Sequence, residues 1–225
     1  MPSRTLAIGD VHGCLAQLDA LLSAIAPGLD DQIIFLGDLV DRGPDSAGVI
    51  RRVRALLKTH HVTIIKGNHE QMMLDARESH AKFTDWLQNG GDATLRSYAG
   101  VRAALRDVPA EDWQFLSTRL ADYFEDETHI FVHANAYPDM PLAEQPDYML
   151  RWERCDQMSP HESGKTIVCG HTPQTSGKPL NLGYGICLDT NACRGGPLTC
   201  LETKSGQIWQ AMGDGRTEKS HLSDF

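Results

Sequence analysis

Six side chains with the chemistry of metal ligands each follow a short apolar run of the sequence. They combine carboxylate or amide oxygens with imidazole nitrogens: Asp10, His12, Asp38, Asn68, His133 and His171. Six ligands are too many for one tetrahedral zinc ion, and the imidazoles argue against calcium or magnesium. We therefore expect two divalent transition ions that share one carboxylate, with manganese (Mn2+) as the first choice and iron (Fe) or zinc (Zn) as alternatives.

Charge counting indicates what such a centre would bind. Two divalent ions beside two aspartates leave a surplus of about two positive charges, which suits a dianionic phosphate group and a metal-bound hydroxide. Ions about 3.5–4 Å apart can generate that hydroxide and stabilise the oxygens of phosphoryl transfer. The expected reaction is hydrolysis of a phosphate monoester by direct attack of a metal-bridging hydroxide. No sequence feature requires a covalent nucleophile.

The segment 37–43, Gly-Asp-Leu-Val-Asp-Arg-Gly, is the centre of this arrangement. It follows the run 33–36, whose β-branched and aromatic residues predict a buried strand. Gly-Asp and Arg-Gly pairs are also common in ordinary polar turns. A ligand site is favoured here because two other predicted strands end in similar turns, Gly-Asp-Val-His-Gly at 9–13 and Lys-Gly-Asn-His-Glu at 66–70.

The apolar runs predict an α/β fold in which parallel strands bring these turns together. Strands at 4–8, 33–36 and 62–65 would alternate with helices at 15–25 and 47–57, and in a right-handed parallel arrangement the strand ends lie side by side. We expect two mixed β-sheets packed as a sandwich flanked by helices, with the metals where strand ends converge. Later strands are predicted at 129–132, 165–169 and 184–188 and in a hairpin of 198–203 with 207–212.

We expect one domain over residues 1–213, followed by a polar and frayed tail at 214–225. Residues 75–122 contain helical pieces and no strand-like run, which predicts a helical insertion over one rim of the site. This insertion is expected to shape substrate access rather than to do chemistry. Its Trp86 is expected to be a packing residue or to line a groove.

Composition excludes several classes of function. With 30 acidic and 21 basic residues, the net charge of −9 offers no attraction to nucleic acid or to an anionic membrane. No apolar run approaches the roughly 18 residues of a membrane span. The six cysteines form no Cys-x-x-Cys pair, so reduced thiols and a cytoplasmic location are expected, with Cys193 as the candidate reactive thiol. The oligomeric state is left open, and a monomer is compatible with the sequence.

The ordered motifs resemble those of a known family. The turns at 9–13, 37–43 and 67–70, with the later His133 and the Gly-His-Thr at 170–172, are similar to the motif set of metallophosphoesterases of the PPP serine/threonine phosphatase family. The stretch 66–73 and the later Trp-Leu-Gln-Asn-Gly-Gly look like the bacteriophage lambda phosphatase and its bacterial relatives. The resemblance implies the calcineurin-like metallophosphoesterase fold.

The resemblance also implies roles for individual residues. His69 would be the general acid that protonates the leaving alkoxide, and Asp41 would hold its imidazole in the productive tautomer. Arg42 would clamp the phosphoryl oxygens together with Asn68 and a second arginine after His133, for which Arg154 is preferred to Arg151. The implied ligands are Asp10 and His12 for the first metal, Asp38 as the bridge, and Asn68, His133 and His171 for the second.

The expected substrates are phosphoserine and phosphothreonine in phosphoproteins or phosphopeptides. One alternative is a bis(5'-nucleosyl)-tetraphosphatase or another nucleotide phosphohydrolase, because enzymes of that kind share these motifs and the Gly-His-Thr-Pro-Gln of residues 170–174 is similar to theirs. Another is a non-catalytic phosphopeptide-binding module on the same fold. Such a module would be expected to have lost metal ligands or His69, and none of these is missing here.

Overall fold

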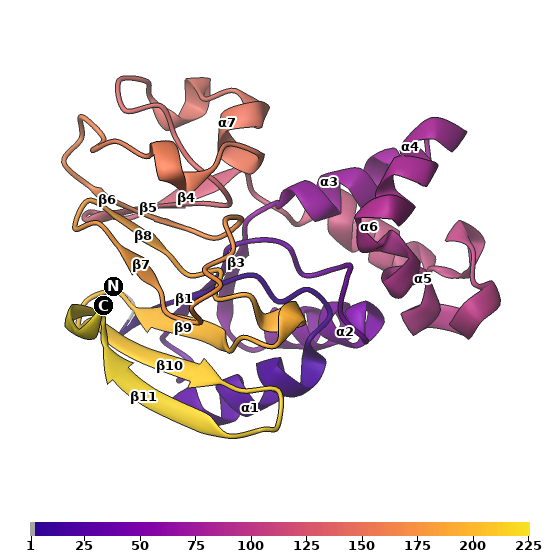
Figure 1. Ribbon diagram of the computed structural model, residues 1–225, viewed down its shortest axis with the longest axis horizontal. Helices are drawn as coiled ribbons and strands as arrows, with labels where there is room; N and C mark the ends of the chain where they lie inside the picture. Colours follow the sequence, from indigo (N-terminus) through magenta and orange to yellow (C-terminus); the bar gives the residue numbers. More distant parts are fainter. Residues whose placement is uncertain (1–2) are drawn as a thin grey trace.

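Two mixed β-sheets pack face to face in the computed structural model, which describes residues 3–225, and helices cover their outer faces (Figure 1). The predicted fold class is therefore confirmed. The predicted domain began at residue 1, and residues 1 and 2 lie outside the described part. No helix within residues 3–225 is long and apolar enough to cross a membrane.

The first sheet has six strands in the order β11-β10-β9-β1-β2-β3. The strands β1, β2 and β3 are parallel neighbours, and helices α1 and α2 connect them as predicted. Strand β9 pairs antiparallel with both β1 and β10. The bounds are β1 (Thr5–Ile8), α1 (Leu15–Ile25), β2 (Gln32–Phe35), α2 (Ser46–Leu56), β3 (His61–Ile64), β9 (Leu198–Glu202), β10 (Gln207–Ala211) and β11 (Thr217–His221).

The second sheet has five strands in the order β4-β5-β6-β8-β7, of which β5, β6 and β8 are parallel. The short helix α7 lies over its outer face (Figure 1). The bounds are β4 (Tyr123–Glu125), β5 (His129–Val132), α7 (Asp147–Arg151), β6 (Thr166–Cys169), β7 (Leu180–Asn181) and β8 (Gly185–Cys187).

Alternate residues of the central strands face two different hydrophobic clusters. On β2, Ile34 packs between the sheets with Phe131 and Val168 of the second sheet. Its neighbours Ile33 and Phe35 pack on the opposite side, in the cluster that includes the apolar residues of α1 and α2. Both faces of these strands are therefore buried, which explains why their sequences are continuous apolar runs rather than alternating ones.

The predicted insertion is helical and gathers at one side of the sandwich (Figure 1). Among the described residues 75–120 no strand is formed, and Ala121 makes an isolated parallel bridge to Ile65. Helix α3 leads from β3 into the insertion. The bounds are α3 (Asn68–Asp75), α4 (His80–Trp86), the π-helical turn η1 (Leu87–Gly91), α5 (Asp92–Ala99) and α6 (Ala110–Thr118).

The prediction of a frayed tail at 214–225 was wrong. Residues 217–221 form β11, which pairs with β10 over five residues at the edge of the first sheet. This segment is polar because an edge strand exposes most of its side chains, so hydrophobic alternation could not reveal it. Strands β4 and β7 were also missed, since each has only two or three residues.

Candidate metal centre

The carboxyl ends of strands from both sheets meet at one site. The Nδ1–H of His133, after β5, donates to the carbonyl oxygen of Leu36, after β2, at 2.8 Å. The backbone N–H of His171, after β6, donates to the carboxylate of Asp10, after β1, with N–O distances of 3.1 Å to both oxygens. The turns of the two sheets are therefore held directly against each other.

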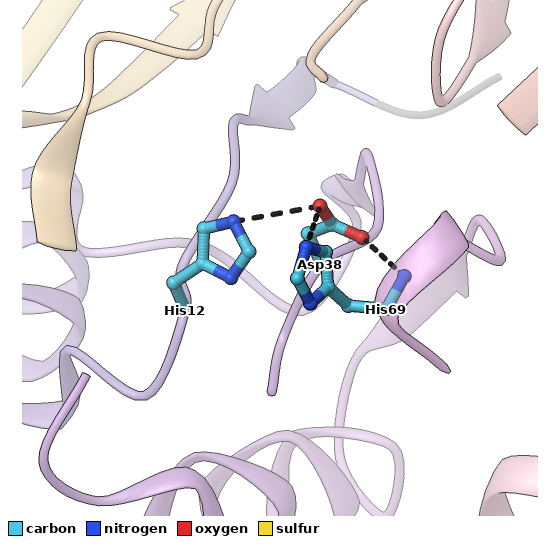
Figure 2. A group of neighbouring side chains, drawn as sticks. All are labelled: His12, Asp38 and His69. Atoms are coloured by element: carbon cyan, nitrogen blue, oxygen red, sulfur yellow. Dashed lines mark hydrogen bonds and ion pairs between the residues drawn. The ribbon is translucent and has the colours of Figure 1, made fainter. Parts of the chain in front are cut away.

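Asp38 lies at the centre of the site, and its two oxygens face different histidines. The Oδ2 atom is 3.4 Å from His12 Nε2 and 3.9 Å from His69 Nε2, on the side shown in Figure 2. The Oδ1 atom is 3.4 Å from His133 Nε2. A carboxylate that presents one oxygen to each of two ligand groups has the arrangement that a bridging ligand of two cations needs.

The imidazoles around Asp38 are oriented as metal ligands are. The Nδ1 atoms of His12 and His133 each lie 2.8 Å from a backbone carbonyl oxygen, that of Val40 and that of Leu36. A carbonyl oxygen only accepts hydrogen bonds, so Nδ1 carries the proton and the Nε2 lone pair faces Asp38. The residues present therefore fit divalent cations. Two groups of neighbouring donors are available, His12 with Asp38 and His69, and Asp38 with His133 and His171. His69 in the first group is the residue predicted to act as the acid, so His12 and Asp38 are the candidate ligands there.

The protonation states of the site's histidines and of Asp38 also favour the binding of cations. Burial lowers the pKa of His12 to about 3 and the pKa of His171 to about 4, so both rings are neutral at pH 7. Burial alone would raise the pKa of Asp38, but the surrounding imidazoles, His133 first, lower it below its ordinary value. Neutral imidazoles around an ionised carboxylate are the forms that bind metal.

The remaining predicted ligands lie beside these two groups. Asn68 Oδ1 is 3.0 Å from His133 Nε2 and 3.2 Å from His171 Nδ1. Asp10 belongs to neither group of donors, although it lies against the His171 turn. The Asp10 carboxylate lies so close to Gly170 that a Cβ atom there would be 2.0 Å from Asp10 Oδ1, so only glycine fits at this position. The assignment of Asp10 as a ligand stays a prediction.

The turns that carry these residues adopt backbone conformations that side chains other than glycine rarely take. Seven non-glycine residues within 3–225 have positive φ, and five of them are at the site. Such conformations persist where the surrounding structure enforces them and are concentrated at functional sites. The five, with their φ values, are His12 (43°), Asp38 (49°), Asp41 (72°), Arg42 (67°) and His171 (64°).

Glu70 fixes the turn after β2, a role that sequence reasoning missed. Its buried carboxylate accepts hydrogen bonds from the backbone N–H groups of Asp38 (2.9 Å), Leu39 (2.7 Å) and Val40 (3.3 Å). It also accepts one from Gly67 at 3.0 Å, so it joins the turns after β2 and β3. Its place in the motif Gly-Asn-His-Glu was the available signal.

His69 and Asp41 form the pair that the resemblance implied. His69 Nδ1 lies 2.7 Å from Asp41 Oδ2. His69 Nε2 is buried and has no hydrogen-bond partner among the described residues. Burial opposes protonation of His69, but the nearby carboxylates of Asp38 and Asp41 raise its pKa above the ordinary value. The imidazole therefore presents one unpaired nitrogen toward the centre and is biased toward carrying a proton there.

Trp86 does more than the packing expected of it. Its ring is fully buried and does not line a groove, and its Nε1–H donates to both oxygens of Asp41, at 2.9 and 3.0 Å. Thr94 also donates to Asp41, at 2.7 Å. The helical insertion therefore contacts the Asp41 partner of His69, whereas the sequence predicted only a cover over the site.

The arginines have different positions. Arg42 is at the centre, where its Nη1–H donates to His12 Nε2 at 2.8 Å. Arg154 is exposed and pairs with Asp156 at 2.8 Å. Arg151 is buried and pairs with Asp122 and Asp147. Within residues 3–225 neither of the latter two side chains bonds to a candidate metal ligand, so the choice of the second phosphate-binding arginine stays a prediction.

All six cysteines are free thiols, as predicted. Burial raises the pKa of the Cys193 thiol. A raised pKa leaves less of the reactive thiolate at neutral pH, which argues against Cys193 as the reactive cysteine considered above.

Comparisons with known proteins agree with this geometry. The family model described as calcineurin-like phosphoesterase matches residues 3–192. The chain is 35% identical to serine/threonine-protein phosphatase 1 of Salmonella typhimurium over 203 residues, which cover 85% of this chain and 88% of that protein. It is 34% identical to a symmetrical bis(5'-nucleosyl)-tetraphosphatase of Janthinobacterium sp. over 148 residues, which cover 62% of this chain and 46% of that protein.

Among solved structures, the chain resembles one described as a putative diadenosine tetraphosphatase. The TM-score is 0.71 at 23% sequence identity, and the match covers 95% of this chain and 96% of that one. This likeness supports the fold.

Proposed function

This chain belongs to the calcineurin-like phosphoesterase family, and we propose that within it the protein is a metal-dependent serine/threonine protein phosphatase. The site geometry supplies the proton donor that an ester of a poor leaving group requires. His69 stands beside the central Asp38 with an unpaired Nε2 and with Nδ1 held by Asp41. A serine or threonine alkoxide leaves slowly unless it is protonated, so a positioned acid matters most for such substrates.

The ions of this phosphoesterase would be held by the donors that surround Asp38, and we propose Mn2+ for both positions. When bound, they supply a nucleophile derived from water and positive charge opposite the phosphate. His12 and Asp38, with Asp10, would hold one ion. Asp38, Asn68, His133 and His171 would hold the other.

The chain's own side chains account for the other requirements of the reaction. His69 would carry a proton on Nε2 and deliver it to the leaving oxygen, while Asp41 keeps Nδ1 protonated and the ring fixed. Arg42 would bind phosphoryl oxygens through its planar guanidinium, which can make two parallel hydrogen bonds. Its present partner is a nitrogen of His12, so this arginine already lies at the centre.

Hydrolysis of dinucleoside polyphosphates is the second candidate function. The identity to the Janthinobacterium enzyme favours it, although the match spans less than half of that protein. The leaving group of a phosphoanhydride is a stabilised phosphate, which needs protonation less than an alkoxide does. Both candidate activities would use the His69–Asp41 pair, so the ester is preferred because the identity to the Salmonella phosphatase spans 88% of that protein, against 46% of the Janthinobacterium enzyme. A non-catalytic binding module is disfavoured because the donors around Asp38 and the acid pair are all present.

Turnover by the metal-stripped protein with added manganese tests the proposal. A phosphoserine peptide and diadenosine tetraphosphate would be compared at matched concentrations by release of phosphate and of nucleotide. We expect a higher kcat/KM for the peptide and a requirement for manganese with both substrates. A higher kcat/KM for the nucleotide would assign the protein to nucleotide hydrolysis, and turnover without metal would contradict the role of the centre.

A further inference from the structure

We propose that Trp86 and Thr94, both supplied by the helical insertion, are positioning residues that hold the Asp41 carboxylate so that His69 can deliver its proton. The inference rests on the proposed role of His69 as general acid. It gives the helical insertion a role in proton delivery, in addition to covering one rim of the site.

The Asp41 carboxylate is saturated with donors. It is fully buried, and its Oδ2 accepts hydrogen bonds from His69 Nδ1 at 2.7 Å and from Trp86 Nε1 at 2.9 Å. Its Oδ1 accepts from Trp86 Nε1 at 3.0 Å and from Thr94 Oγ1 at 2.7 Å. The indole N–H thus spans both oxygens and fixes the plane of the carboxylate, and that plane sets the direction of the hydrogen bond to His69.

Thr94 fixes the backbone of the same residue. Its hydroxyl oxygen accepts the backbone N–H of Asp41 at 2.8 Å while its O–H donates to the carboxylate. Ser46 Oγ also accepts that N–H, at 3.0 Å. Asp41 has a φ of 72°, a conformation that is unfavourable for aspartate unless its surroundings hold it.

The π-helical turn Leu87–Gly91 places Trp86 at this carboxylate. Gly91 lies so close to the indole that a Cβ atom there would be 2.3 Å from the ring. Gly90 has a φ of 107°, and its carbonyl oxygen accepts the backbone N–H of Arg42 at 3.1 Å. The turn therefore packs against Trp86, which binds the partner of His69, and also holds the backbone of Arg42, the arginine proposed to bind phosphate. These two close contacts explain why its two adjacent glycines are needed.

A leaving-group comparison tests the proposal. Trp86→Phe keeps an aromatic ring and removes the N–H donor, and Thr94→Val keeps the shape and removes the hydroxyl. The substrates would be phenyl phosphate, whose phenolate needs protonation, and p-nitrophenyl phosphate, whose leaving group is stable as an anion. We expect each variant to lose about tenfold in kcat on phenyl phosphate and less than about threefold on p-nitrophenyl phosphate, with KM unchanged. Equal losses on the two esters would overturn the proposal.

Controls separate positioning from damage to the fold. Trp113→Phe makes the same substitution in the same insertion, where the Arg77 guanidinium lies 4.8 Å from the centre of the Trp113 ring. Both rates of this variant should stay at wild-type values. Melting temperatures would be measured for every variant, and Thr94→Val carries the test if Trp86→Phe does not fold.

The His69→Ala background distinguishes the possible failures. Trp86→Phe should cause no further loss there, because the acid through which it acts is absent. If His69→Ala leaves the ratio of the two rates unchanged, the acid assignment fails and the inference fails with it. If His69→Ala changes the ratio and Trp86→Phe does not, only the inference fails. Neither ester is a peptide or a nucleotide, so the result is independent of which of these the protein prefers.

Discussion

His133 Nδ1 donates a hydrogen bond to the carbonyl oxygen of Leu36, and this contact of 2.8 Å joins the two sheets of the sandwich at the metal centre. His133 directly follows a strand of one sheet and Leu36 directly follows a strand of the other. The same hydrogen bond orients the Nε2 atom of His133 toward Asp38. The same hydrogen bond therefore contributes both to the packing of the two sheets and to the orientation of a candidate metal ligand.

Asp38→Asn should remove the centre as a unit. The amide keeps the shape but loses the charge and one acceptor oxygen, so it cannot bridge two cations. We expect metal content after manganese loading to fall from two ions to one or none, and kcat to fall more than about a hundredfold, since altered outer-shell groups alone cost 10–100-fold. Metal analysis and p-nitrophenyl phosphate turnover measure this. The control Asp75→Asn, at the last residue of α3 and paired with Lys82, should keep full metal content.

Glu70→Gln should weaken both stability and metal binding. The amide nitrogen would face at least one pair of buried backbone N–H groups, which would lose their acceptor. At about 1–3 kcal/mol for each of the two buried groups left unpaired, we expect the free energy of unfolding to fall by about 2–6 kcal/mol. Denaturant unfolding of the metal-free protein measures this. The matched change Glu78→Gln, at an exposed pair with Lys82, should alter stability by less than about 0.5 kcal/mol. Equal effects of the two substitutions would contradict the role of Glu70.

Arg154→Ala and Arg151→Ala should have different phenotypes. If Arg154 binds phosphate, its removal raises KM for p-nitrophenyl phosphate about tenfold with little effect on stability, since its side chain is 59% exposed. Arg151 is only 4% exposed and is held by two carboxylates, so its removal should lower the free energy of unfolding by about 1–3 kcal/mol. A rise in KM for Arg151→Ala alone would exchange the two assignments.

Stability should depend on pH through Asp31. Burial opposes ionisation of Asp31, but hydrogen bonds from Arg4, Ser3 and the Gly28 N–H lower its pKa to about 2. The unfolded chain binds this proton near pH 3.9, so the stabilisation is complete above that pH and is lost as pH falls toward 2. The difference in unfolding free energy between wild type and Asp31→Asn should be constant from pH 5 to 8 and shrink below pH 4. Denaturant unfolding of the metal-free proteins checks this, and a difference that grows on acidification would contradict it.

The sequence by itself determined the framework of the centre. The predicted strands 4–8, 33–36 and 62–65 correspond to β1, β2 and β3, and the predicted helix 15–25 has the bounds of α1. These predictions succeed because apolar periodicity is local and because parallel strands must place their carboxyl ends together. The polar residues that follow each strand could therefore be expected from the sequence alone to lie close together.

Only the tertiary structure decided which groups hold that centre in place. Trp86 lies 45 residues from Asp41 in the chain, and no periodicity predicts that its N–H would find that carboxylate. Glu70 and Thr94 likewise act on backbone groups that are distant in sequence. The edge strand β11 was missed for a related reason, because its stability comes from pairing with β10 and not from apolar residues of its own. The residue types at each strand end can be read directly from the sequence. Hydrogen-bond partners and strand pairing instead depend on which distant segments the folded chain brings into contact.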